Sequence, residues 1–416
     1  CFVLLLTLRV NVWLSLIGAV LAGFCVNNLV LYEAGHMTKL NAIATGALVL
    51  SGVILLFRER YMVGGLIFAL GLALNLLTNH VQMTYYWAFV IGLYIIIKTV
   101  QKIKAGEVAS LGKIAGIAII ALVLAVGSNA SKLWTTWEYS QETMRGEPIL
   151  AKQGEAQSSS ETEGLEWNYA MNWSNGWLDV MANFIPAVVG GSSAEPVKDS
   201  YKMYRIARQS GTDQFPYYWG ALPFTSGPAY YGAVALFLFV MSLIFLKSDL
   251  KWWAIGSFVL ITLISMGKHF ELLNRFLYDY FPLYSKFRSP NSAMSILAIV
   301  VPFFGIYGLQ KWLNKKKYSK EDQKKLLISA GVLAAIAAFF AVLGPSMFDF
   351  SSDGDQRYAQ MGLDLDLIRE DRKTMMRSDA FRSLIFVALS AGLLWYYMRN
   401  QFNKGYLYAG LGLLAI

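Results

Sequence analysis

The stretch YWGALPFTSGPAYYGAVALFLFVMSLIF, Tyr218–Phe245, joins two kinds of sequence. Its first half is aromatic, rich in Gly and Pro and without charge, and its second half is an apolar run that can enter a bilayer. Because Trp and Tyr prefer the depth of the membrane–water interface, the first half can be a simple anchor for the helix, a role that suits Tyr230 and Tyr231. It can also wall a pocket at the membrane surface, where a lipid-borne substrate presents its head group.

The rest of the chain repeats the apolar pattern. It has 416 residues, of which 56% are hydrophobic and only 15% are charged, and a soluble protein of this size needs a more charged surface. We therefore expect an all-α, polytopic transmembrane bundle, because lipid tolerates no open backbone. The expected segments are 12–32, 40–57, 61–78, 83–97, 114–127, 229–246, 252–266, 293–309, 326–343 and 381–398, with partial segments at 1–8 and 406–416.

The charges of the connecting loops predict the orientation. On one side, six short loops hold half of the 36 Lys and Arg residues but only 5 of the 27 acids. By the positive-inside rule this side is cytoplasmic, and the long polar loops 128–228, 267–290 and 344–382 are extracytoplasmic. The net charge of +9 is thus a signal of topology, and no pattern typical of nucleic-acid binding is present.

These patterns divide the chain into five regions. We expect N-terminal transmembrane helices in 1–127, an extracytoplasmic loop region in 128–228, transmembrane helices in 229–344, an extracytoplasmic helical segment in 345–382 and C-terminal transmembrane helices in 383–416. Within the loop region, GEAQSSSETEG (154–164) is expected to be a flexible linker. Since both ends of the sequence lie in apolar runs too short to span, we expect it to be the interior of a longer protein.

Three ionisable residues occur together in YEAGHMTKLNAIA (32–44). Glu33, His36 and Lys39 are spaced by three, so a helical geometry would place them on one face at the membrane interface. Glu33 or His36 can then serve as acid or base, and Lys39 can hold a phosphate. The alternative is a capped helix end with snorkelling side chains, and we weigh the two equally.

A second polar group lies at the next turn on the same side, in TNHVQMTYYW (78–87). His80, Gln82 and Tyr85 can hydrogen-bond a sugar, whereas Tyr86 and Trp87 suit an aromatic belt.

Basic residues occur before a helix start in FPLYSKFRSPNSAM (281–294). Lys286 and Arg288, together with the helix N-terminus, favour a phosphate or pyrophosphate. Interfacial snorkelling is the alternative.

The acidic pair Asp364-x-Asp366 is a candidate for a divalent metal, the one cofactor left open. Asp371, Arg372, Asp379 and Arg382 follow with helical spacing, so a surface helix with salt bridges is the better interpretation, and no metal ligand is assigned. No nucleotide-binding fingerprint is present, so ATP-driven transport has no support.

Several stretches in order resemble one family: EAGHMTKLNAIA, NHVQMTYY, YWGALPFTSGPAYYGA, YDYFPLYSKFRSP and IREDRKTMMRSDAFRSL. The chain resembles YfhO-like membrane proteins of the Bacteroidota type, which are similar to the GT-C superfamily of glycosyltransferases. The resemblance implies a multi-pass protein of the bacterial inner membrane with periplasmic loops. It also implies that Trp219 and Phe224 stack on sugar or isoprenoid. The main catalytic acid would lie upstream of Cys1, so Glu33 and His36 are the catalytic candidates in this sequence.

The expected function is transfer of a sugar from a polyprenyl-phosphate carrier to an envelope glycopolymer or an exported protein. Two alternatives stay open: a non-catalytic subunit of an envelope assembly or export complex, with membrane-protein partners, and a transporter of lipid-linked saccharides. A transporter is expected to carry charges in mid-helix and detectable repeats, whereas the segments here have few mid-helix charges and no evident inverted repeat.

Overall fold

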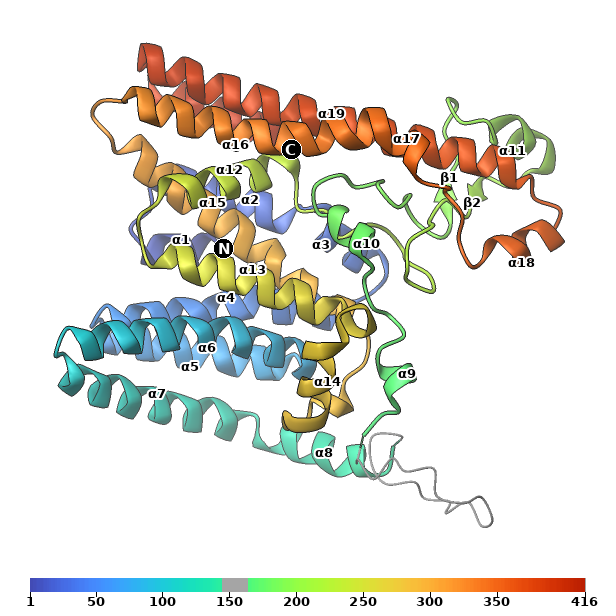
Figure 1. The fold of residues 1–416 in the computed structure, drawn as a ribbon. Helices are drawn as coiled ribbons and strands as arrows, with labels where there is room; N and C mark the ends of the chain where they lie inside the picture. The colour runs from blue at the N-terminus through green and yellow to red at the C-terminus, as the bar shows by residue number, and fades with distance from the viewer. Residues whose placement is uncertain (144–163, 416) are drawn as a thin grey trace. The chain divides into compact units, whose positions relative to one another are not determined.

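The computed structural model describes residues 1–143 and 164–415, so the predicted linker 154–164 lies outside the described residues except for its last glycine. The protein is mainly helical, with one two-stranded antiparallel sheet between β1 (Glu195–Pro196) and β2 (Gln214–Phe215) among the described residues (Figure 1). The chain forms two compact units, each made of separate stretches. Unit 1 contains Cys1–Gly35, Gly176–Ile255 and Leu297–Ile416; unit 2 contains His36–Asn175 and Gly256–Ile296.

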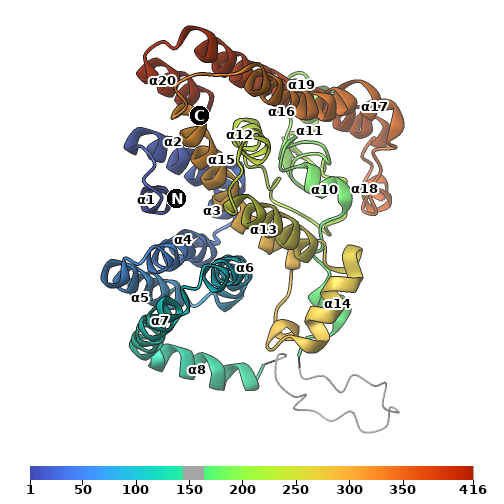
Figure 2. The ribbon, with the colours of Figure 1, turned by 60° about the vertical axis from the view of Figure 1, so that its left-hand side comes forward.

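Unit 2 is built on four long helices that pack side by side, as Figures 1 and 2 both show. They are α4 (Met37–Phe57), α5 (Tyr61–Leu77), α6 (Val81–Lys104) and α7 (Val108–Ser128). The shorter elements are α8 (Ala130–Gln141), α9 (Trp167–Ala170), η1 (Gly267–Phe270), α14 (Glu271–Tyr280), η2 (Tyr284–Lys286) and η3 (Pro290–Ile296). Helix α13 (Leu250–Ser265) begins in unit 1 and ends in unit 2.

Small residues and a buried amide hold this helical bundle together. Gly64 and Gly71 of α5 lie directly against the backbone of α4, which permits the close approach typical of membrane helices. Asn75, 1% exposed, donates to the Ala42 carbonyl at 2.8 Å and to Thr45 at 2.9 Å, and accepts a bond from Thr84 at 2.6 Å. This single side chain therefore links α4, α5 and α6.

Unit 1 contains a second group of long helices. They are α2 (Val12–Gly23), α12 (Ala233–Phe245), α15 (Leu297–Leu313), α16 (Lys320–Ala338) and α19 (Leu365–Asn400). Its other helices are α1 (Phe2–Thr7), α3 (Val26–Glu33), α10 (Trp177–Met181), α11 (Tyr204–Ser210), the π-helical turn η4 (Phe339–Leu343), α17 (Gly344–Met347), α18 (Asp355–Gln360) and α20 (Lys404–Ala415). Helix α15 packs against α12 and α2, and α16 packs against α19.

Within residues 1–143 and 164–415, six helices are long and apolar enough to cross a membrane, or eight if two bent pairs each count as one span. This confirms a multi-pass, all-α membrane protein. Each of the twelve expected segments contains a helix, but α5 and α12 are shorter than a span. Residues 12–32, expected as one helix, bend by 47° after Gly23, and the Asn28 amide donates at 2.8 Å to the Ala22 carbonyl that the break leaves without a helical partner.

Two other expectations also need correction. The boundary expected at 382/383 lies inside α19, which continues for 36 residues. At 1.5 Å per residue α19 is about 54 Å long, more than a bilayer core of about 30 Å, so one end extends beyond it. Tyr231, expected as an interfacial anchor, is 1% exposed and belongs to the core of unit 1.

Candidate functional site

The candidate site lies at the start of α4. The chain does not form one continuous helix here, although the sequence pattern suggested one helical face. Glu33 is the last residue of α3, and His36 is the N-cap of α4. Gly35 between them has φ 75°, a left-handed conformation that a glycine adopts without strain. Since the helix ends and restarts here, the prediction that Glu33 shares one helical face with His36 and Lys39 is wrong.

Lys39 lies in the first turn of α4 and makes one described hydrogen bond. Its Nζ donates to Ser292 Oγ of η3 at 3.1 Å. In the described parts of the chain no carboxylate lies within ion-pair distance of this ammonium group. Lys39 is half-buried, and partial loss of hydration without a counter-charge is unfavourable for a cation, so the arrangement favours an anion beside Lys39.

His80, the N-cap of α6, lies within electrostatic range of Lys39. Burial, and then the positive charge of Lys39, lower the pKa of His80 to about 4. Its Nδ1 is buried without a hydrogen-bond partner among the described residues. Loss of hydration and the charge of Lys39 also lower the pKa of His36. At neutral pH both imidazoles are therefore neutral, and the free Nδ1 of His80 can bond a ligand.

Helix α6 also fixes the loop that precedes η3. Gln82 Nε2 donates to the Arg288 carbonyl at 2.6 Å, and Tyr85 Oη donates to the Pro282 carbonyl at 2.8 Å. The loop contains Leu283 with φ 65° and Ser289 with φ 59°, which are strained for residues with a Cβ. A strained backbone conformation persists only where surrounding contacts hold it in place. Gln82 and Tyr85 supply such contacts, so they act here as residues that position the loop before η3.

The two predicted basic residues of this loop each contact an aromatic ring. The guanidinium of Arg288 lies 5.6 Å from the ring centre of Tyr169 and also donates to its hydroxyl. Lys286 Nζ lies 5.7 Å from the ring centre of Trp137. Arg288 is exposed, and its carbonyl is held by the same α6 that carries His80 at its N-cap. Unit 2 thus brings His36, Lys39, His80, Gln82, Tyr85 and Arg288 to one end of the α4–α6 pair.

The remaining predicted residues belong to unit 1. Trp219 is 8% exposed, and its ring centre lies 4.9 Å from that of Phe350, so core packing accounts for its aromatic side chain. Phe224 is 59% exposed and keeps the surface that stacking would need. Glu33 is exposed at the end of α3.

The Asp364-x-Asp366 pair has a structural explanation. Asp364 is the N-cap of α19, and its carboxylate accepts bonds from the backbone N–H of Asp366 at 3.1 Å and of Leu367 at 3.2 Å. Such a cap satisfies N–H groups that the first helical turn leaves free. Within residues 1–143 and 164–415 no three His, Cys, Asp or Glu side chains gather as a metal site.

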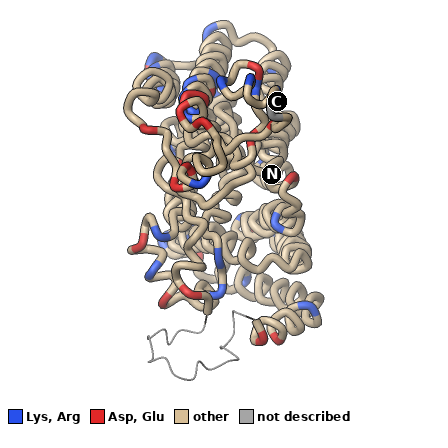
Figure 3. The backbone as a smooth tube through the Cα atoms, turned by 90° about the vertical axis from the view of Figure 1, so that its right-hand side faces the viewer, with Lys and Arg blue, Asp and Glu red and all other residues tan. Residues whose placement is uncertain are grey.

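The predicted surface helix contains a buried ion pair that the helical spacing did not reveal. Arg372 is 0% exposed, and it bonds both carboxylate oxygens of Asp355 at 2.9 and 3.0 Å. Asp379 and Arg382 do form the expected i,i+3 pair at 3.1 Å. Figure 3 shows acidic and basic segments close together around α18 and the start of α19.

Two residues of unit 2 were missed by the sequence analysis. Ser292 provides the hydroxyl beside Lys39, and Asn291, the residue before it, has a buried side-chain oxygen without a described partner. The signal was present in the Ser-Pro-Asn-Ser sequence at 289–292, which was interpreted only as a helix start.

No protein-family model, no curated protein and no solved structure matches the chain.

Proposed function

We propose that this chain is a membrane glycosyltransferase of the GT-C type, acting at the extracytoplasmic face of a bacterial inner membrane on a polyprenyl-phosphate-linked sugar. The acceptor is an envelope glycopolymer or an exported protein. One observation carries the proposal: Lys39, at the end of a membrane span, bonds a serine hydroxyl and has no carboxylate partner in the described chain. A lipid phosphate supplies the missing anion at this depth.

The chemistry follows from where charge develops. As the bond between the anomeric carbon and the phosphate oxygen breaks, negative charge grows on the leaving phosphate. The ammonium group of Lys39 and the hydroxyl of Ser292 are held where they can stabilise that charge before it forms. Arg288 supplies a second, planar cation suited to bidentate phosphate binding.

The acceptor hydroxyl attacks the anomeric carbon and gives its proton to a base. Neutral His36 and the carboxylate of Glu33 are the candidates among the residues of this chain. His80 is too weakly basic to hold that proton at neutral pH, because its pKa is about 4. We assign it to hydrogen bonding of the sugar or the phosphate.

The test is a transfer assay on protein reconstituted with a polyprenyl-phosphate sugar. Loss of one such charged donor typically lowers turnover by about 10²–10³-fold, so we expect this loss for Lys39→Met and for Arg288→Ala. Arg288→Lys should restore part of the activity, since lysine keeps the charge without the planar fork. Lys317→Met, at an exposed lysine of the α15–α16 loop, is the matched control and should leave turnover unchanged.

A non-catalytic role is the second candidate, because the described residues place no carboxylate beside Lys39. Binding of polyprenyl phosphate, measured without an acceptor, separates the two. Binding that depends on Lys39, with no transfer by the wild-type chain in any acceptor mixture, would favour a lipid-binding subunit. Unchanged binding in Lys39→Met would contradict both.

A further inference from the structure

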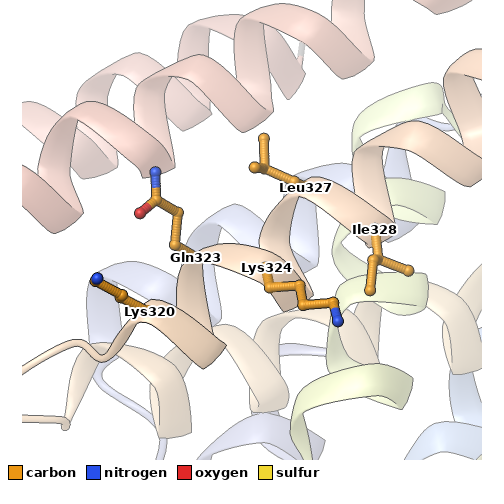
Figure 4. A pocket seen from close by; sticks show the side chains of 5 residues that line it. All are labelled: Lys320, Gln323, Lys324, Leu327 and Ile328. Atoms are coloured by element: carbon orange, nitrogen blue, oxygen red, sulfur yellow. The ribbon is translucent and has the colours of Figure 1, made fainter.

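One face of α16 in unit 1 carries polar and apolar side chains in a fixed order. Lys320, Gln323, Lys324, Leu327 and Ile328 recur at the spacing of one helical face and line a shallow hollow of about 450 Å³. Figure 4 shows all five side chains projecting from this one helix. The basic residues occupy the first turns, and the aliphatic residues follow.

The lysines of this face differ from their neighbours in their contacts. Lys325 pairs with Glu321 at 2.7 Å, and Lys315 pairs with Asp322. Lys320 and Lys324 have no ion-pair or hydrogen-bond partner in the described ranges 1–143 and 164–415. Two free ammonium groups one helical turn apart form a site for an anionic group.

The apolar part of the face continues along the helix. The side chains of Leu327, Ile328 and Val332 are 56%, 44% and 48% exposed, and a Cβ added at Gly331 would meet no atom within 4 Å. At 1.5 Å per residue, Ile328 lies about 12 Å along the axis from Lys320. The face is therefore a cationic end followed by an open aliphatic strip, on a helix that can cross the membrane.

We propose that this face binds one anionic phospholipid. The lipid phosphate lies between Lys320 and Lys324, with the amide of Gln323 beside it. One acyl chain lies along Leu327, Ile328 and the gap at Gly331. Charge complementarity selects an anionic head group, and the order of the residues matches the order of head group and chain in a bilayer. The site lies in unit 1 and is independent of the proposed transfer reaction.

The test is native mass spectrometry of the purified chain with phosphatidylglycerol or phosphatidylcholine. Each lysine near a membrane surface contributes about 1 kcal/mol toward an anionic lipid, so Lys320→Gln with Lys324→Gln should weaken phosphatidylglycerol binding by about 10–30-fold. Lys316→Gln with Lys317→Gln removes the same charge from the preceding loop and should change binding less than about twofold if binding is local. Phosphatidylcholine should bind weakly to all variants.

Two further arms examine the source of the anion and the role of the strip. Inorganic phosphate should not displace the lipid, since it lacks the chain. Gly331→Leu places a side chain on the strip and should weaken binding of long-chain but not of dihexanoyl phosphatidylglycerol. Equal loss in both lysine pairs would overturn the proposal, because it would show diffuse attraction only. The proposal would also be overturned if the double lysine variant changed the oligomeric state while lipid binding stayed the same. That result would assign the face to a second copy of the chain.

Discussion

Replacing Arg372 by methionine should destabilise unit 1 more than any surface substitution on the same helix. Arg372 is fully buried and donates to both oxygens of Asp355 and to the carbonyls of Tyr217, Phe350 and Pro216. Asp355 is 4% exposed. Burial opposes its ionisation, but the bonds from Arg372 and Ser352 outweigh that cost and hold its pKa below the usual range.

The expected loss in the free energy of unfolding follows from the buried groups that Arg372→Met leaves without a partner. The buried Asp355 carboxylate loses the buried cation that bonds both of its oxygens and keeps the partly exposed Arg369, whose Nη2 lies 3.8 Å away. Breaking a buried pair from one side costs about 3–5 kcal/mol, so we expect a loss toward the lower end of this range. Arg372→Lys keeps the charge but has three donors in place of a planar fork of five, so we expect a smaller loss. The Phe350 carbonyl, bonded by Arg372 at 2.7 Å, belongs to a residue with φ 57°, so this strained turn should also relax.

Denaturation of the detergent-solubilised protein, followed by tryptophan fluorescence, measures the change in the free energy of unfolding. Trp219 reports locally, because its ring lies 4.9 Å from that of Phe350. The control is Lys373→Met, which removes a partly exposed i,i+3 partner of Glu370 and should cost about 0.5 kcal/mol or less. If Arg372→Met cost no more than this control, the buried pair would not stabilise unit 1 and the reasoning would fail.

Three other outcomes are expected. In a cysteine-free background, Gln356→Cys should react with an impermeant thiol reagent in intact cells and Lys317→Cys should not; the opposite pattern would invert the predicted orientation. Since His80 has a pKa of about 4 in the fold and about 6.5 when unfolded, the unfolded chain binds more protons between these values. Stability should therefore rise with pH across this window, by at most about 3 kcal/mol, and unfolding curves of His80→Asn should show a flatter rise. Asn75→Leu should cost about 1–3 kcal/mol, because Thr84 and two α4 oxygens lose their buried partner; equal unfolding midpoints would refute this.

Hydropathy predicted the helices well because lipid imposes one strong constraint on every span. It could not predict their interruptions, since those depend on single side chains. The bend after Gly23 lies where the Asn28 amide bonds the Ala22 carbonyl, and the pair Asn27-Asn28 within an apolar run does not by itself predict which carbonyl is bonded. Likewise, helical spacing on α19 suggested exposed ion pairs within that helix. The partner of Arg372 is instead Asp355 of α18, which the spacing of residues on α19 cannot predict.

The candidate site was predicted in part because its residues lie at helix ends, and helix ends on one side of a membrane can meet. His36, Lys39, His80, Gln82, Tyr85 and Arg288 do gather in unit 2. Their individual contacts were not predictable, because they depend on the path of the loop before η3. Gln82 and Tyr85 bond backbone carbonyls of that loop, and Ser292 provides the contact of Lys39.

The two cations Arg372 and Lys39 differ in how many of their hydrogen-bond donors the fold itself satisfies. Each lies within or beside a membrane-spanning helix, where a charge without a partner is costly. Arg372 has a carboxylate and several carbonyls that use its donors, so the fold alone explains it. Lys39 has one serine hydroxyl among the described residues and a neutral histidine within electrostatic range. Among the described residues the fold therefore leaves the charge of Lys39 without an acidic partner, and this is why we propose an anionic group from the lipid side as its ligand.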